Sequence, residues 1–180
     1  MEFKAREEKI VVLAHCVLNQ STRWWQNEKK PRAKGPVMEV LEALSKLNIG
    51  AVQLPCPEFT FCGNPRPPRT KDEYERLPGF RLHCEDLAKA SAKNLKTLTD
   101  MGRKPKVHIL AVVGVTHSPT CGVKCTPRML DGKVEYIDEK GLFIEILERE
   151  MEKLGLRTAF IEFDFHTPEN LCENLYKIMK

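Results

Sequence analysis

The chain has 180 residues, enough to bury one hydrophobic core but too few for two ordinary ones, so we predict a single domain spanning residues 1–180. Its apolar fraction of 42% and charged fraction of 30% are typical of a soluble globular protein, and no apolar run approaches the ~20 residues that a membrane-spanning helix needs. The net charge of +4 comes from 29 basic and 25 acidic residues that are interspersed, so bulk nucleic-acid binding is not indicated.

The first half of the chain predicts two strands and two helices. An apolar run at residues 10–14 predicts a strand, and Gly35-Pro36 opens a segment whose apolar residues repeat at helical spacing. A second apolar run at 49–54 predicts another strand. Residues 87–101 return to helical spacing and stop at Gly102. The strand runs are nearly continuous, as expected for strands buried on both faces of a parallel sheet.

The second half repeats this alternation. Residues 107–115 predict a third strand, 143–154 a helix and 158–163 a fourth strand. The last helix begins at Thr167-Pro168, a favourable cap and first-turn pair, with three residues expected on its inner face: Leu171, Leu175 and Ile178. Together the elements predict an α/β fold with a Rossmann-like, open, mainly parallel sheet and helices on both faces.

Three long loops, at residues 16–34, 55–78 and 116–135, interrupt this pattern. Loops of this length in a compact domain are usually functional.

The apolar run that precedes Cys16 has five residues, shorter than the core of a signal peptide, so we expect a cytoplasmic protein. Because the cytosol keeps thiols reduced, the seven cysteines indicate metal binding or catalysis more than disulfides.

Cys16, Cys56 and Cys121 each follow a predicted strand. Since the carboxyl ends of the strands form the ligand crevice of an open α/β sheet, we expect the three thiols at one edge. One such cysteine would be read as a small buried apolar residue, but three favour shared ligation. Thiolates select zinc or iron–sulfur clusters, and the chain lacks the two close cysteine pairs of a structural zinc site. A cubane cluster with one open iron is therefore favoured over zinc, with Cys62 or Cys125 as the candidate for any fourth ligand.

The segments around these cysteines resemble three motifs of the thiouracil desulfidase family, in the family's order. The family's Cys-Leu-Leu-Gly…Arg-Tyr, Cys-Pro-Glu…Pro-Arg and Ser-Pro-Ser-Cys-Gly motifs are matched by Cys16-Val17-Leu18-Asn19 with Arg23-Trp24, by Pro55-Cys56-Pro57-Glu58 with Pro65-Arg66-Pro67, and by Ser118-Pro119-Thr120-Cys121-Gly122. Asn19 stands where the family has glycine, Thr22 where it often has cysteine, and His83-Cys84 where it has an Asp-Val-Thr-type segment. These departures fall where a ligand would be recognised.

The resemblance implies a [4Fe–4S] cluster on Cys16, Cys56 and Cys121 whose open iron takes the sulfur of a thiolated pyrimidine. Sulfur would then be exchanged for water without redox chemistry. Glu58 and Ser118 match polar family positions beside the cluster. We expect Glu58 to donate and later accept a proton, the alternative being a helix cap or a solvated carboxylate. Ser118 could bind cluster or substrate, or simply form a turn.

Other polar and aromatic residues have weaker assignments. Asn19 and Arg66 are the predicted substrate-binding residues, with arginines suited to the phosphate of a nucleotide. The remaining candidates are Arg69 and Arg128 for phosphate, Trp24 and Trp25 for base stacking, His15 and His117 as structural residues beside the cysteines, Cys172 as core, and Cys62, Cys84 and Cys125 without an assigned role.

The predicted function is [4Fe–4S]-dependent removal of sulfur from a small thiolated pyrimidine base or nucleotide. Two alternatives stay open: a zinc-stabilised nucleotide-binding domain, and an iron–sulfur protein that delivers sulfur to another enzyme. The sequence does not indicate the oligomeric state.

Overall fold

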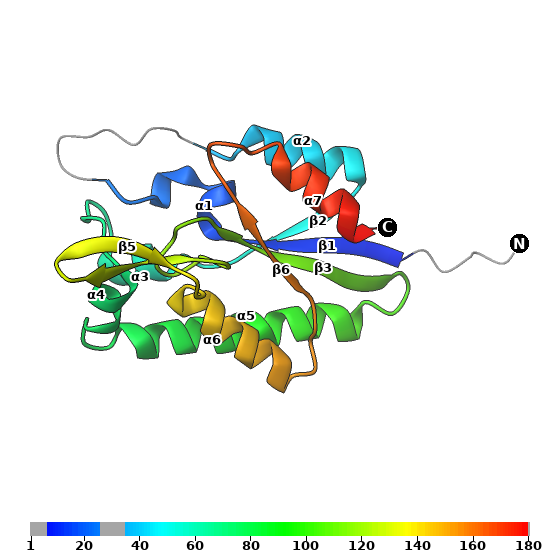
Figure 1. Cartoon of the computed structure of the whole chain (residues 1–180). Helices are drawn as coiled ribbons and strands as arrows, with labels where there is room; N and C mark the ends of the chain where they lie inside the picture. The colour runs from blue at the N-terminus through cyan, green and yellow to red at the C-terminus, as the bar shows by residue number, and fades with distance from the viewer. Residues whose placement is uncertain (1–6, 26–34, 180) are drawn as a thin grey trace, which may run out of the picture.

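A four-stranded, wholly parallel sheet forms the centre of the molecule (Figure 1). The computed structural model describes residues 7–25 and 35–179. The strand order is β2-β1-β3-β6, and the strands span Glu7–Leu13 (β1), Gly50–Gln53 (β2), Lys106–Val115 (β3) and Ala159–Phe163 (β6). The predicted α/β fold, with its open parallel sheet, is confirmed.

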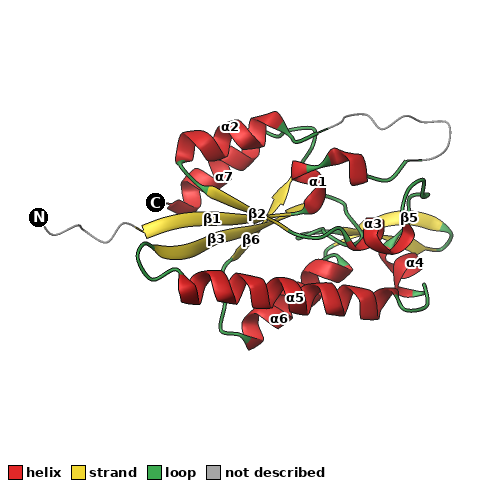
Figure 2. Ribbon diagram, turned by 180° about the vertical axis from the view of Figure 1, so that it is seen from behind, coloured by secondary structure: helices red, strands yellow, loops and turns green. Residues whose placement is uncertain are grey.

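Two pairs of helices cover the two faces of this sheet (Figures 1 and 2). Helices α2 (Met38–Leu47) and α7 (Asn170–Met179) pack together on one face, and α5 (Phe80–Met101) and α6 (Leu142–Lys153) on the other. The central strands are consequently buried on both sides, which is why their sequence is continuously apolar. Residues 11–13 of β1 and residues 111–113 of β3 are fully buried.

The three predicted loops contain short elements that apolar periodicity does not indicate. The first holds α1 (His15–Leu18) and the 3-10 turn η1 (Gln20–Thr22), while its residues 26–34 lie outside the described residues. The second holds α3 (Pro57–Cys62) and α4 (Lys71–Glu75). After this loop, α5 begins at Phe80, earlier than residue 87, where the sequence predicts its start. The third, predicted to end at residue 135, contains most of an antiparallel hairpin of β4 (Thr126–Leu130) and β5 (Lys133–Ile137), which extends two residues further. One-turn helices are too short to show a repeating pattern.

Two expectations for the last helix need correction. Ile178 is 36% exposed, although Leu171 and Leu175 are buried as predicted. In the final turn of the helix it is the neighbouring Met179 that packs against the core. Cys172 is half-buried and lies outside the main apolar cluster. None of the described helices is both long enough and apolar enough to cross a membrane.

Candidate active site

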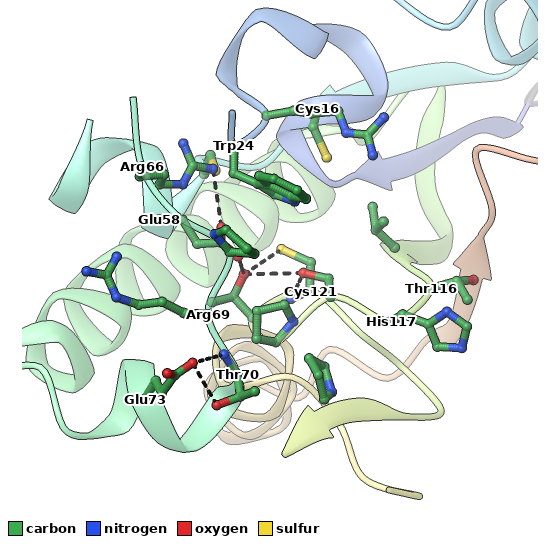
Figure 3. Close-up of a pocket in the computed structure, with 18 of the residues that line it drawn as sticks. Cys16, Trp24, Glu58, Arg66, Arg69, Thr70, Glu73, Thr116, His117 and Cys121 are labelled. Atoms are coloured by element: carbon green, nitrogen blue, oxygen red, sulfur yellow. Dashed lines mark hydrogen bonds and ion pairs between the residues drawn. The ribbon is translucent and has the colours of Figure 1, made fainter. Parts of the chain in front are cut away.

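Three cysteines from three strand ends line one cavity of about 400 Å³. Cys16 lies in α1 directly after β1, Cys56 is the N-cap residue of α3 after β2, and Cys121 lies in the turn after β3. In Figure 3 the sulfurs of Cys16 and Cys121 both face the space between them. The parallel sheet thus brings together residues that are far apart in the sequence.

Cys121 is buried and Cys16 and Cys56 are half-buried, and the three thiols are close enough to influence one another's charge. Burial raises the pKa of Cys16 to about 12 and that of Cys56 to about 11, and it raises the pKa of Cys121 well above its ordinary value. The nearby Cys56 sulfur raises the Cys16 pKa further, and both of these sulfurs raise that of Cys121. Three thiolates here need the positive charge of a bound metal centre, so the donor set fits one.

The spacing of the donors bears on the kind of metal centre. Within residues 7–25 and 35–179, no three histidine, cysteine or acidic side chains lie close enough to surround a single metal ion. Tetrahedral zinc requires every sulfur at ~2.3 Å from one ion. A four-iron cluster is larger than one ion, so thiolates that ligate such a cluster lie farther apart than those that share one zinc. Neither Cys62 nor Cys125, the candidates for a fourth ligand, lines the cavity.

Glycines let the backbone of the Cys121 turn pack closely against its surroundings. A Cβ on Gly141 would lie 2.5 Å from the carbonyl carbon of Thr120 and 2.7 Å from the nitrogen of Gly122. A Cβ on Gly114, in β3, would overlap the carbonyl oxygen of Cys121. These obstacles are backbone atoms, which cannot rotate away. The position of Cys121 therefore depends on the absence of side chains at both glycines.

Substitution Gly141→Ala is expected to displace this turn. The overlap should lower the free energy of unfolding by about 1–3 kcal/mol and reduce the iron that the chain retains after anaerobic reconstitution. Gly50→Ala is the matched control, because the nearest atom to its Cβ is a side-chain methyl of Ile10 at 3.1 Å, away from the cavity. Equal iron retention in the two variants, measured by colorimetry, would show that the turn tolerates the methyl group.

Glu58 is a buried carboxylate held by three donors beside the cysteines. It lies in the first turn of α3, after Pro57, and is 8% exposed. Its Oε1 accepts a hydrogen bond from Thr120 Oγ1 at 2.7 Å, and its Oε2 accepts from Tyr74 OH at 3.1 Å. Arg66 Nη2 donates to the same Oε2 at 3.2 Å (Figure 3). Burial and the adjacent carboxylate raise the pKa of Tyr74, so the phenol remains a donor.

Arg66 lines the cavity but is largely committed to the protein. It is 4% exposed, and its Nη1 donates to the carbonyl of Thr22 at 3.0 Å and to Asn64 Oδ1 at 2.6 Å. With Nη2 on Glu58, only Nε has no partner among the described atoms. Both terminal nitrogens of Arg66 bond to protein acceptors and its Nε is buried, so its main contact is the ion pair with Glu58.

The remaining predicted site residues are distributed unevenly. Ser118 lines the cavity, where its Oγ accepts from the backbone nitrogen of Cys121 at 2.9 Å, as a turn-forming serine does. Asn19 does not line the cavity; its side chain accepts from Ser21 N at 3.2 Å and caps η1. Arg128 also lies outside the lining and forms ion pairs with Glu75 and Glu139.

Several lining residues are available to a ligand. Trp24 and Arg69 both line the cavity, and Arg69 forms no ion pair within the described part of the chain. Arg23 lies over the ring of Phe165, 3.9 Å from its centroid. Trp25 is absent from the lining, and His15 is tied to the carbonyl of Leu54 at 3.2 Å. The partners Thr120, Tyr74 and Phe165 had no sequence signal beyond the position of Thr120 beside Cys121.

Thr120 connects the carboxylate to a cysteine, because its Oγ1 is 2.7 Å from Glu58 Oε1 and 3.7 Å from Cys121 Sγ. Thr120→Val keeps the shape but removes this donor, leaving a buried carboxylate oxygen without its partner. We expect a loss of about 1–3 kcal/mol in unfolding free energy and a lower turnover. Thr120→Ser is the control and should retain both. Wild-type stability of the valine variant, measured by urea denaturation, would contradict this account.

Comparisons with known proteins agree with this architecture. The sequence profile of the family described as "Putative 2-thiouracil desulfurase" matches residues 8–179. The chain is 30% identical over 156 residues to the uncharacterized protein MJ0003 of Methanocaldococcus jannaschii, covering 87% of this chain and 86% of that protein. The fold of the present chain is similar to that of the [4Fe-4S]-dependent thiouracil desulfidase TudS, with a TM-score of 0.50 and 18% sequence identity. The match covers 96% of the present chain and 99% of the TudS chain. The chain belongs to the 2-thiouracil desulfurase family.

Proposed function

We propose that this protein is a desulfidase that removes sulfur from a thiolated pyrimidine base or nucleotide, with a [4Fe–4S] cluster held by Cys16, Cys56 and Cys121. The observation that supports it best is the meeting of three thiols with Glu58 around one cavity. A cluster with three cysteine ligands supplies an open, thiophilic iron that acts as a Lewis acid on a carbon–sulfur bond. The overall exchange consumes water and yields a carbonyl and hydrogen sulfide, without net electron transfer.

Glu58 would handle the protons of this exchange. It would first take a proton from the attacking water and then return one to the departing sulfur, which reverses the order expected from the sequence. Its donors Thr120, Tyr74 and Arg66 hold the carboxylate in one orientation, so that it faces the cavity without first reorganising. Ser118 would complete this side of the site by holding the turn of Cys121.

Residues at the outer part of the cavity would bind the rest of the substrate. Trp24 is 46% exposed and offers an indole face for stacking on the base. Arg69 and Arg23 line the same cavity and offer guanidinium groups to the phosphate of a nucleotide substrate. These residues replace Arg128, which is held by two glutamates, as the candidates for anchoring the phosphate.

The experiment that tests this proposal begins with protein purified anaerobically and reconstituted. It should contain about four irons and four sulfides per chain. Incubation with 2-thiouracil and with 4-thiouridine monophosphate should release sulfide and form uracil or uridine monophosphate in equal amounts. A full cluster that releases no sulfide from either compound would favour the sulfur-carrier alternative. One tightly bound zinc without iron would overturn the cluster assignment.

A further inference from the structure

His117 has a backbone conformation that favours another residue type. Its φ is 61°, and it occupies the third position of a four-residue turn closed by Ser118 N donating to Val115 O at 3.1 Å. Glycine or asparagine is preferred at that position. Within residues 7–25 and 35–179, the other positive-φ residues that are not glycine are Asn48, at the end of α2, and Asp131, in the hairpin turn. Such residues are common at both kinds of position. The turn alone therefore does not account for a histidine.

The side chain of His117 is not used by the fold. It is exposed, it lines the cavity, and no hydrogen bond to its ring is found within the described part of the chain (Figure 3). Its ring contacts Tyr136 of β5, with ring centroids 4.3 Å apart at an interplanar angle of 43°. Tyr136 also lines the cavity, is 58% exposed and has no described hydrogen-bond partner for its hydroxyl. Two aromatic rings thus meet at the cavity with free polar groups.

The hairpin is fixed in the orientation that produces this contact. On the face turned away from the cavity, Arg128 is half-buried and forms ion pairs with Glu139 and with Glu75 of α4, both at 2.5 Å. Because side chains alternate along a strand, the opposite face is turned to the cavity, and its lining residues are Pro127, Met129, Val134 and Tyr136. The result is an apolar wall with polar groups at one end, which suits a planar ring that has a polar edge.

We propose that His117 and Tyr136 form a ring-recognition pair that contacts the substrate, an inference that rests on the proposed function. The imidazole has one donor and one acceptor when neutral, so it can bond either an N–H or a carbonyl on the edge of a pyrimidine. Tyr136 packs against the imidazole ring of His117 and supports it. The pair determines which heterocycle enters the cavity, and the chemistry remains with the cysteines and Glu58.

His117→Gly removes the side chain and leaves the turn unstrained, because glycine adopts a positive φ without steric strain. We expect the Tm of this variant to be unchanged or higher, while the Kd for uracil, measured by calorimetry on cluster-loaded protein, rises about tenfold, as loss of one hydrogen bond implies. The KM for 2-thiouracil should rise similarly, with a much smaller change in kcat. His117→Asn, which tolerates this φ, should lie between the two. Tyr136→Leu should also raise the Kd.

Asn48→Gly is the matched control, since Asn48 also has a positive φ, at 54°, but lies outside the cavity lining. It should leave the Kd and KM unchanged. If His117→Gly binds uracil as tightly as wild type and has the same KM, the histidine serves only the turn and the inference is overturned. If wild type binds uracil but releases no sulfide, the proposed function fails while the comparison of Kd values still tests the pair. A wild type that binds neither uracil nor 2-thiouracil would overturn both.

Discussion

Alanine substitution of Cys16, Cys56 or Cys121, one at a time, is expected to reduce the iron content from about four per chain to near zero and to abolish sulfide release. Each thiol lines the same cavity, and each is the contribution of one strand end. A cluster that has lost one of three ligands would have two anchors and two open irons, which leaves it prone to dissociation. The fold should persist, because alanine replaces cysteine as a small apolar residue.

Cysteines outside the cavity provide the controls for this series. Cys62→Ala and Cys125→Ala should retain full iron content and activity, since neither residue lines the cavity. Iron and sulfide assays give the cluster content, and a thermal melt of each apo-protein shows whether the fold is intact. Full iron retention in any of the three ligand variants, or iron loss in Cys62→Ala, would require a different ligand set.

The sequence predicted the central sheet because burial on both faces leaves an unmistakable apolar signal. The four runs found in the sequence lie within strands β1, β2, β3 and β6 or differ from them by a few residues at the ends. Hairpin β4–β5 gives no such signal, since most of its residues are exposed or half-buried and polar residues such as Arg128 alternate with apolar ones such as Met129. Its role as a cavity wall depends on tertiary packing against α4, which local sequence does not encode.

The candidate site was predictable to the extent that it follows from topology. Because parallel strands end at the same edge, Cys16, Cys56 and Cys121 could be placed together from their positions after three strands. The environment of Glu58 could not be predicted in this way, since its hydrogen-bond partners Thr120 and Tyr74 come from separate segments of the chain. The ion pair with Glu58 likewise changed the interpretation of Arg66, which sequence alone treats as a free cation.

Glu58→Gln is expected to lower kcat by about 10²–10⁴-fold, the usual contribution of a proton-transferring group, while the iron content stays at the wild-type level. Glutamine preserves the side-chain shape, but its single carbonyl oxygen can accept from Thr120 or from Tyr74 and not from both, because these two donate to different oxygens of Glu58. It also cannot take up a proton from water. The substitution also leaves Arg66 without its charged partner, and both side chains of this pair are at most 10% exposed. The free energy of unfolding should therefore fall by about 3–5 kcal/mol.

Arg66→Gln separates catalysis from this structural effect. It breaks the same buried ion pair and should cost a comparable amount of stability, yet it leaves the carboxylate facing the cavity with its hydrogen bonds from Thr120 and Tyr74. We therefore expect Arg66→Gln to lose less than about tenfold in kcat, far less than Glu58→Gln. Both variants should be assayed at a temperature where urea denaturation shows them to be folded. Equal losses of kcat in the two would mean that Glu58 holds the site together and transfers no proton.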